Sequence, residues 1–120
     1  QGFIRPSKVE LFVMNADGSD QRQVTALSGA NFGPSWSPDG KKIIFSSNFV
    51  APRSGNFDLY LVDAEANMAT ADQLERITTS EVFDGFAMFH PTENKLIWAS
   101  NRHAKSTGET NVFVADFKWE

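Results

Sequence analysis

A long internal repeat constrains the fold of this 120-residue chain more than any other feature of its sequence. Residues 34–48, PSWSPDGKKIIFSSN, recur without gaps as residues 87–101, AMFHPTENKLIWASN, at an offset of 53 residues. Repeats with periods of roughly 20–50 residues form solenoids, propellers or arrays, because each unit buries its apolar face against its neighbour. The chain is therefore expected to be a tandem array of one structural unit.

A second motif completes the repeating unit. Residues 10–15, ELFVMN, return as residues 58–63, DLYLVD, and again as residues 111–116, NVFVAD. Such short apolar runs between polar turn residues are typical of strands that are buried on both faces, as in stacked sheets. The first return is at an offset of 48 residues and the second at 53. The extra five residues fall within residues 64–73, where a hairpin turn tolerates an insertion.

Turn residues separate these strands. Asp17-Gly18 and Asp39-Gly40 lie between strand pairs, where glycine supplies the positive φ that a tight hairpin requires. In the second copy His90 and residues 92–94 replace the motif, so a different type of turn is expected there. One unit is then four antiparallel strands, the first ending at Trp36 or Phe89.

Four short antiparallel strands repeated at this period are the blade of a β-propeller. We therefore predict an all-β fold in which residues 1–120 form one partial β-propeller of about two and a quarter blades. Residues 10–25 would be the outer strands of one blade, residues 31–78 a complete blade, and residues 84–117 the first three strands of a further blade.

Two segments resemble a known family. Residues 36–43, WSPDGKKI, and residues 11–19, LFVMNADGS, are similar to the WD-like repeat of TolB-like β-propellers, and the resemblance extends over nearly the whole chain. It implies a propeller that closes with six or seven blades. It also implies an exported protein, periplasmic or otherwise.

The resemblance leaves two functions open, because fold alone does not fix function. In the first, the chain is a non-catalytic scaffold that binds a protein partner or another ligand through loops gathered at one face: residues 29–33, 48–56, 79–85 and 101–110. The candidate contacts there are Asn31, Arg53, Phe83, Asp84, Arg102 and His103. In the alternative, the chain is a fragment of the gating propeller of a prolyl-oligopeptidase-type serine peptidase, with the catalytic domain outside these residues.

No residue of this chain is predicted to be catalytic, to ligate a metal or to bind a cofactor. The sequence has no cysteine and no Gly-x-Ser-x-Gly nucleophile motif, and His90 and His103 are not spaced as a metal pair. Residues 15–20 cluster carboxylates and amides around Gly18, but the spacing of a calcium loop is absent, so a hairpin turn is expected instead. We therefore do not expect an enzyme.

Charge and hydropathy exclude two further classes of partner. The net charge is −4 and the eleven lysines and arginines are scattered, so no basic patch predicts a nucleic-acid partner. The chain has no apolar stretch of about 20 residues, the length needed to span a bilayer.

Aromatic residues recur at matched positions of the repeat, which favours packing between blades. These positions are Trp36, Phe45, Tyr60, Phe89, Trp98 and Phe113. Trp36 and Phe89 in particular are expected to be buried at equivalent places. A carbohydrate-stacking platform is the alternative use of aromatics, and it would have to come from the loop residues Phe32, Phe49, Phe57, Phe83 and Phe86.

The number of strands leaves the array open. Nine strands cannot close a propeller, so apolar residues such as Leu11, Val13, Val112 and Val114 belong to incomplete blades. Either the chain is part of a longer propeller or several copies assemble around an axis. In both cases we expect that these residues alone do not form a stable monomer, and that the terminal strands lie against other polypeptide.

Overall fold

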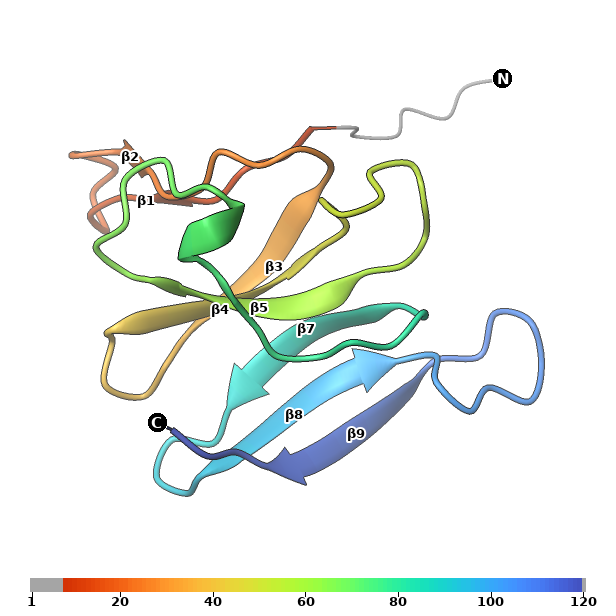
Figure 1. Ribbon diagram of the computed structural model, residues 1–120. Helices are drawn as coiled ribbons and strands as arrows, with labels where there is room; N and C mark the ends of the chain where they lie inside the picture. Colours follow the sequence, from red (N-terminus) through yellow and green to blue (C-terminus); the bar gives the residue numbers. More distant parts are fainter. Residues whose placement is uncertain (1–7, 120) are drawn as a thin grey trace.

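The sequence repeat becomes a stack of antiparallel sheets in the computed structural model, which describes residues 8–119 (Figure 1). Two sheets have two and four strands: β1 (Phe12–Val13) with β2 (Arg22–Gln23), and β3 (Asn31–Trp36), β4 (Lys42–Ser47), β5 (Asp58–Asp63) and β6 (Glu75–Arg76), in chain order. The third sheet is β7 (Asp84–Phe89), β8 (Lys95–Ser100) and β9 (Asn111–Asp116). A 3₁₀ turn, Ala71–Gln73, precedes β6. The predicted all-β partial propeller is confirmed.

The backbone repeats with the same offset as the sequence. Ile44 pairs with Leu61 between β4 and β5, and Ile97 pairs with Val114 between β8 and β9. The inner strands β3 and β7 each carry a bulge at the matched place, between Phe32 and Ser35 and between Gly85 and Met88. A bulge leaves one residue out of the ladder and can redirect its side chain. The irregularity is therefore part of the repeating unit.

The hairpins lie where they were predicted, and their chemistry differs between copies. Gly40 has φ of 74°, and the Asp39 carboxylate accepts hydrogen bonds from the Ser37 hydroxyl (2.7 Å) and the Lys41 amide (3.0 Å). In the second copy the ring nitrogen Nδ1 of His90 accepts from the Thr92 and Glu93 amides at 3.1 and 3.0 Å. His90 thus organises a turn without aspartate or glycine.

The fourth strand of each unit ends slightly earlier than predicted, because a threonine takes over the ladder. The sequence placed these strand ends at residues 24–25 and 77–78, whereas β2 and β6 end at Gln23 and Arg76. The hydroxyl of Thr25 accepts the Leu11 amide at 3.0 Å, and the hydroxyl of Thr78 accepts the Leu59 amide at 2.9 Å.

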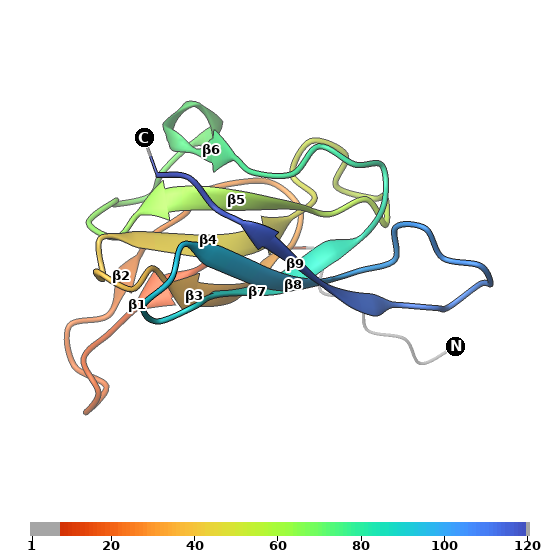
Figure 2. The same ribbon diagram turned by 90° about the horizontal axis from the view of Figure 1, so that it is seen from below.

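The core consists of two apolar layers between the three sheets. Alternate residues of β4 point into different layers: Ile43 and Phe45 contribute to the layer facing β1 and β2, and Ile44 to the layer facing β7 and β8. The strands are buried on both faces, which explains their continuous apolar runs. Burying one such side chain is worth about 1.5–3 kcal/mol, so each layer contributes several increments of this size to the stability. Figure 1 shows the sheets stacked one above another, and Figure 2 looks onto the stack from below, with β8 and β9 in front of β4 and β5.

One predicted core position is wrong: Trp36 is 53% exposed. Its counterpart Phe89 is partly buried because the rings of Phe117 and Trp119 lie over it, each with its centroid 5.0 Å away. The residues equivalent to Phe117 and Trp119 beside Trp36 are Ala64 and Ala66, which are too small to cover an indole. Trp36 instead lines an open cavity of about 250 Å³ between β1 and β3.

Within residues 8–119, no helix has the length and apolar composition that crossing a membrane requires.

Substitution of these two aromatics tests the assignment of the core. Phe45→Ala should lower the free energy of unfolding by about 3–5 kcal/mol, because Phe45 is fully buried and its loss leaves a cavity. Trp36→Ala should cost only about 1 kcal/mol, because that ring is already half in water. Urea unfolding followed by far-UV circular dichroism, at one fixed protein concentration, measures both values. Equal costs would contradict the assignment.

Candidate functional site

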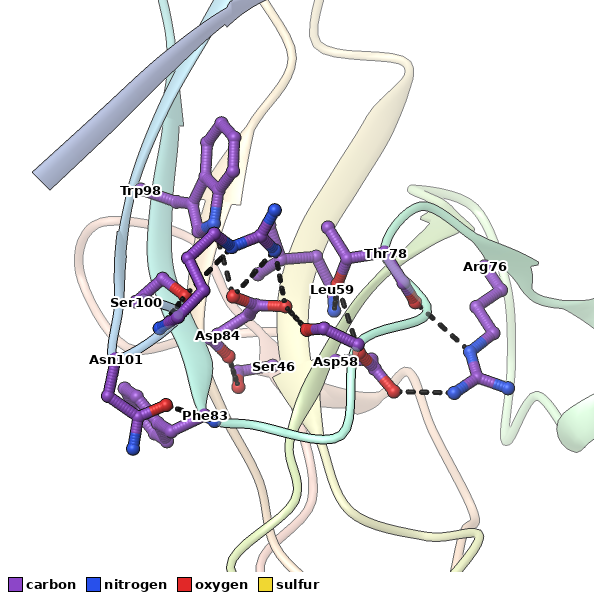
Figure 3. A network of polar contacts seen from close by, with 12 residues as sticks. Ser46, Asp58, Leu59, Arg76, Thr78, Phe83, Asp84, Trp98, Ser100 and Asn101 are labelled. Atoms are coloured by element: carbon purple, nitrogen blue, oxygen red, sulfur yellow. Dashed lines mark hydrogen bonds and ion pairs between the residues drawn. The ribbon is translucent and has the colours of Figure 1, made fainter. Parts of the chain in front are cut away.

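A polar network holds the start of β7 (Figure 3). Asp84 is the first residue of β7 and is fully buried. Its carboxylate accepts hydrogen bonds from the Arg102 guanidinium at 3.0 Å, from the Ser80 hydroxyl at 2.7 Å and from the Trp98 indole at 3.2 Å. A buried charge is tolerated only when it is paired and hydrogen-bonded in this way.

Arg102 connects this network to the loop that follows β8. Its Nε donates to the Ser100 hydroxyl at 3.0 Å, and its guanidinium carbon lies 5.2 Å from the Trp98 ring centroid and 5.7 Å from that of Phe113. The side chain is 27% exposed. Arg102 therefore fastens the 101–110 loop to β7 through charge, hydrogen bonds and cation–π contacts.

The ionisation of Asp84 depends on this arrangement. Burial raises the pKa of the carboxyl, but the nearby hydroxyls of Ser100 and Ser80, the Arg102 guanidinium and the Thr78 hydroxyl together lower the pKa by more. The result is a pKa below the ordinary value of 3.8. Asp84 is thus an anion at neutral pH, and its negative charge is paired with Arg102 inside the protein.

Asn31 takes the place of Asp84 in the preceding unit. It is the first residue of β3 and fully buried, and its amide donates to the Val9 carbonyl (2.9 Å) and to Glu10 (3.3 Å). Its side-chain oxygen accepts from the Ser47 hydroxyl. The neutral amide needs no cation, and position 49, equivalent to Arg102, is phenylalanine.

Four phenylalanines gather where the two larger sheets meet, and we call Phe32, Phe57, Phe83 and Phe86 the aromatic cluster. Ring centroids are 5.3 Å apart for Phe32 and Phe57, 5.6 Å for Phe32 and Phe86, and 5.7 Å for Phe57 and Phe83. These are normal edge-to-face distances for aromatic pairs. The cluster brings together segments that are far apart in sequence.

The backbone fixes the cluster firmly. The Phe83 amide donates to Asn101 Oδ1 at 2.9 Å, and the Asp84 amide donates to the Phe57 carbonyl at 2.8 Å. Gly85 makes room for the ring, because a Cβ there would lie 2.6 Å from the Phe83 ring. Phe83 can therefore lie across β7 only because residue 85 is glycine.

Phe86 is the exposed member of the cluster, and its backbone is strained. It lies in the β7 bulge with φ of 56° and is 59% exposed. A positive φ is unfavourable for a bulky side chain, and such outliers concentrate at functional sites. The equivalent residue in β3 is Gly33, with φ of 65°, which adopts this conformation without strain.

The aromatic cluster departs from the repeat. The residues equivalent to Phe57, Phe83 and Phe86 in the preceding unit are Val9, Ala30 and Gly33. Val9 and Ala30 form the same parallel bridge as Phe57 and Phe83. The scaffold is therefore built equally well without these rings, and stacking of the sheets alone does not account for them.

The sequence-predicted contact residues are only partly brought together. Phe83, Asp84 and Arg102 lie next to one another, but Asp84, like Asn31, is buried and bonded within the protein. Arg53 lies in the exposed part of the loop after β4, and His103 is exposed with its ring 6.4 Å from Phe113. Their binding roles stay predictions, and those of Asn31 and Asp84 are not carried further.

The members of the aromatic cluster were among the loop phenylalanines listed from the sequence, but only Phe83 was predicted to be a contact residue. Four of the five loop phenylalanines considered for a stacking platform form the cluster, while the Phe49 ring packs on Tyr60 at 5.0 Å. The signal that could have identified them is the comparison of the copies, where phenylalanine replaces valine, alanine and glycine. Among residues 8–119, no group of three or more potential ligands is placed to hold a metal ion.

Removal of the Asp84 charge tests the network. Asp84→Asn should lower the free energy of unfolding by about 3 kcal/mol at pH 7, because Arg102 loses its anionic partner. Since the pKa of Asp84 is lowered by folding, its contribution is present above the unfolded-state pKa of about 3.9 and is lost as the pH falls through the folded-state pKa.

The variant should therefore lose less stability than the parent between pH 7 and pH 3. Urea midpoints at both pH values measure this difference, and Glu81→Gln, at an exposed carboxyl, should behave as the parent. An unchanged pH dependence in Asp84→Asn would show that the network does not hold β7.

Comparison with known proteins finds similar sequences over part of their length. No family model matches the chain. An uncharacterized protein of Agrobacterium fabrum is 30% identical over 97 residues, which are 81% of this chain and 30% of that protein. Dipeptidyl-peptidase 5 of Porphyromonas gingivalis is 46% identical over 39 residues, which are 32% of this chain and 6% of that enzyme. The chain thus spans less than a third of either relative.

Two solved structures are similar over 89% of the chain. One is a putative TolB from Agrobacterium tumefaciens, with a TM-score of 0.67 and 25% identity, of which 37% is covered. The other is TolB from Acinetobacter baumannii, with a TM-score of 0.64 and 22% identity, of which 24% is covered. The three sheets described above therefore have the fold of a segment of a TolB-type β-propeller.

Proposed function

We propose that this chain is part of a non-catalytic, TolB-like propeller scaffold in an exported protein, and that it binds a protein ligand through the aromatic cluster. The observation that carries the proposal is the divergence of the two copies: rings appear at one sheet junction where the other has Val9, Ala30 and Gly33. The two copies share one backbone, so a side chain that only one copy carries is not required for the fold and is a candidate for ligand binding.

The strain at Phe86 supports the same conclusion. A phenylalanine with positive φ costs about 1–3 kcal/mol, and more than half of this side chain faces solvent, so its packing returns little of that cost. An aromatic ring that is held rigidly and left open to solvent is what binding sites commonly use as an anchor. Phe86 is the residue we place at the centre of the interface.

The chemistry of the surroundings favours a peptide side chain over a sugar. The side chains of Asn101 and Asp84, which adjoin the cluster, already bond to the Phe83 backbone and to Arg102. Phenylalanine has no polar atom with which to orient a hydroxylated ring. An aromatic or branched aliphatic side chain of a protein ligand therefore suits the cluster better.

Two loops supply the polar rim in this proposal. The loops after β4 and after β8 project from the same end of the sheets (Figure 1) and contain Arg53 and His103. Arg102, at the base of the second loop, is partly exposed and anchored by Asp84. Loops on a rigid scaffold commonly carry recognition.

Two variants of one residue test the site. A displayed peptide library is selected on the chain, and the affinity of an enriched peptide is measured by fluorescence anisotropy. Enriched peptides should contain an aromatic or branched aliphatic residue, and Phe86→Ala should weaken binding by roughly 10–100-fold, the loss of an anchor worth about 1–3 kcal/mol. Phe12→Ala, at an equally exposed phenylalanine of β1, is the control and should bind as the parent.

Phe86→Gly distinguishes a binding role from a structural one. Glycine relieves the positive φ, so the free energy of unfolding should change by about 1 kcal/mol or less, while the affinity falls as in Phe86→Ala. Unchanged affinity in both variants would contradict the proposal.

A gating propeller of a serine peptidase is the second candidate, favoured by the 46% identity to dipeptidyl-peptidase 5 over 39 residues. Both candidate functions use the same propeller fold, so the presence of a reactive serine is what distinguishes them. The natural gene product that contains this chain should not react with a fluorophosphonate probe, which labels activated serines. Labelling that is abolished by a single serine substitution would decide for the peptidase.

A further inference from the structure

Two equivalent asparagines bond to the backbone just before an inner strand. Asn48 follows β4 and Asn101 follows β8, at matched positions of the repeat. Asn48 Oδ1 accepts a hydrogen bond from the Ala30 amide, and Asn101 Oδ1 accepts one from the Phe83 amide, both at 2.9 Å. A backbone N–H can bond only to the oxygen of a side-chain amide, so this contact fixes the orientation of both asparagines. In each copy the side-chain nitrogen Nδ2 therefore points away from that backbone.

The two copies use this nitrogen differently. Asn48 Nδ2 donates to the carbonyls of Pro52 and Ser54, both at 3.1 Å, and so holds the loop after β4 against the sheet. Asn48 is 6% exposed under that loop. Asn101 is partly exposed, and its Nδ2 makes no hydrogen bond with any residue between 8 and 119. Figure 3 shows the oxygen of Asn101 directed at Phe83 and the nitrogen directed away from it.

The course of the loop after β8 explains the difference. The residues equivalent to Pro52 and Ser54 are Lys105 and Thr107. Their loop closes on itself, because the Lys105 amide donates to the Glu109 carboxylate. Figure 1 shows this loop extending beyond the ends of β8 and β9. Its carbonyls therefore do not return to the asparagine, as those of the loop after β4 do.

The unpaired nitrogen adjoins the aromatic cluster. Asn101 and Phe83 are bonded twice, because the Asn101 backbone amide also donates to the Phe83 carbonyl at 3.2 Å. The Phe83 ring centroid lies 5.7 Å from that of Phe57 and 6.2 Å from that of Phe86. A group that accepts from Asn101 Nδ2 therefore lies beside a residue of the cluster.

We propose that Asn101 binds the main chain of a peptide ligand. Its Nδ2 donates to one or two backbone carbonyls, while a neighbouring side chain of the ligand packs on the aromatic cluster. This inference rests on the proposed binding of a protein ligand by that cluster. Asn48 provides the precedent within the chain, because the same amide on the same backbone there binds two carbonyls of a short segment.

The donor also restricts the class of ligand. The Asn101 oxygen is occupied by Phe83, so the side chain offers donors only. A carbonyl, which only accepts, suits it better than a hydroxyl, which must also donate. Carbonyls inside helices and sheets are already bonded. The segment bound at Asn101 is therefore a loop or a chain terminus of the partner protein.

Asn101→Asp tests the donor without removing the bond to Phe83. Aspartate keeps an oxygen for the Phe83 amide but replaces the donor with a second oxygen, which repels a carbonyl. The probe is a peptide enriched from a displayed random library on the natural gene product that contains this chain, with affinity measured by fluorescence anisotropy. Asn101→Asp should weaken binding by about 10-fold, the loss of a hydrogen bond with added repulsion. Asn94→Asp, the same change of charge at the exposed turn before β8, should bind as the parent.

The peptide side of the bond is tested by replacing each amide of the enriched peptide in turn with an ester, whose carbonyl is a weaker acceptor. One ester should weaken binding to the parent by roughly 3-fold and leave binding to Asn101→Asp unchanged, because that variant already lacks the bond. Ester effects that are the same in both proteins at every position would overturn the proposal.

Urea unfolding distinguishes binding from structural support. Asn101→Asp should have the urea midpoint of the parent, whereas Asn48→Asp should unfold at a lower concentration because it loses two internal hydrogen bonds. A midpoint of Asn101→Asp as low as that of Asn48→Asp would overturn the proposal.

Phe86→Ala separates this inference from the proposed function. Weaker binding by both Phe86→Ala and Asn101→Asp supports the two together. Weaker binding by Phe86→Ala alone would overturn the role of Asn101 and leave the aromatic cluster as the binding site. Unchanged binding by both variants, or a selection that enriches no peptide, would overturn both.

Discussion

Sheet-on-sheet packing through β4 and β5 is the interaction on which the rest of the structure depends. These two strands alternate their side chains between the two apolar layers, so that Phe45 belongs to one layer and Ile44 to the next. Removing either layer would expose a fully apolar face of the middle sheet. The hairpins and the threonine strand ends complete the individual sheets that this packing holds together.

A repeat array of this kind separates support from function in a way that a single domain does not. Each unit can be compared with its neighbour position by position, since both have the same backbone structure. Asn31 and Asp84 show one use of the comparison: a neutral amide and a charged carboxylate satisfy the same buried position, and the charge requires Arg102. Phe86 and Gly33 show the other: the same positive φ is held by a phenylalanine in one copy and by a glycine in the other.

The strands and hairpins could be predicted because they follow from local patterns that occur twice. The repeat placed β4 and β8, and the glycine at position 40 placed a turn. Exposure of Trp36 could not be predicted from register alone, because it depends on the size of a neighbouring residue. That neighbour is Ala64 beside Trp36, whereas its equivalent beside Phe89 is Phe117. Burial of Asp84 likewise depends on Arg102, 18 residues away, which only the folded chain brings into contact.

The members of the aromatic cluster could be listed from the sequence, but their convergence could not be predicted from it. They were recognised as loop residues, whereas what marks them is their contrast with the other copy. Their convergence depends on three-dimensional details such as the space above Gly85 and the hydrogen bond from Phe83 to Asn101. No periodic pattern encodes these contacts.

The central claim is that stacking between sheets supplies the stability of this chain, and that two of its faces need other polypeptide. Size-exclusion chromatography with light scattering, combined with thermal unfolding of the 120 residues, tests it most directly. The account predicts non-specific association or a broad, weakly cooperative transition, because the side of the β7–β9 sheet that carries Val112 and Val114 and the surface around Trp36 are apolar and exposed. A sharp, monomeric species that melts cooperatively would contradict it.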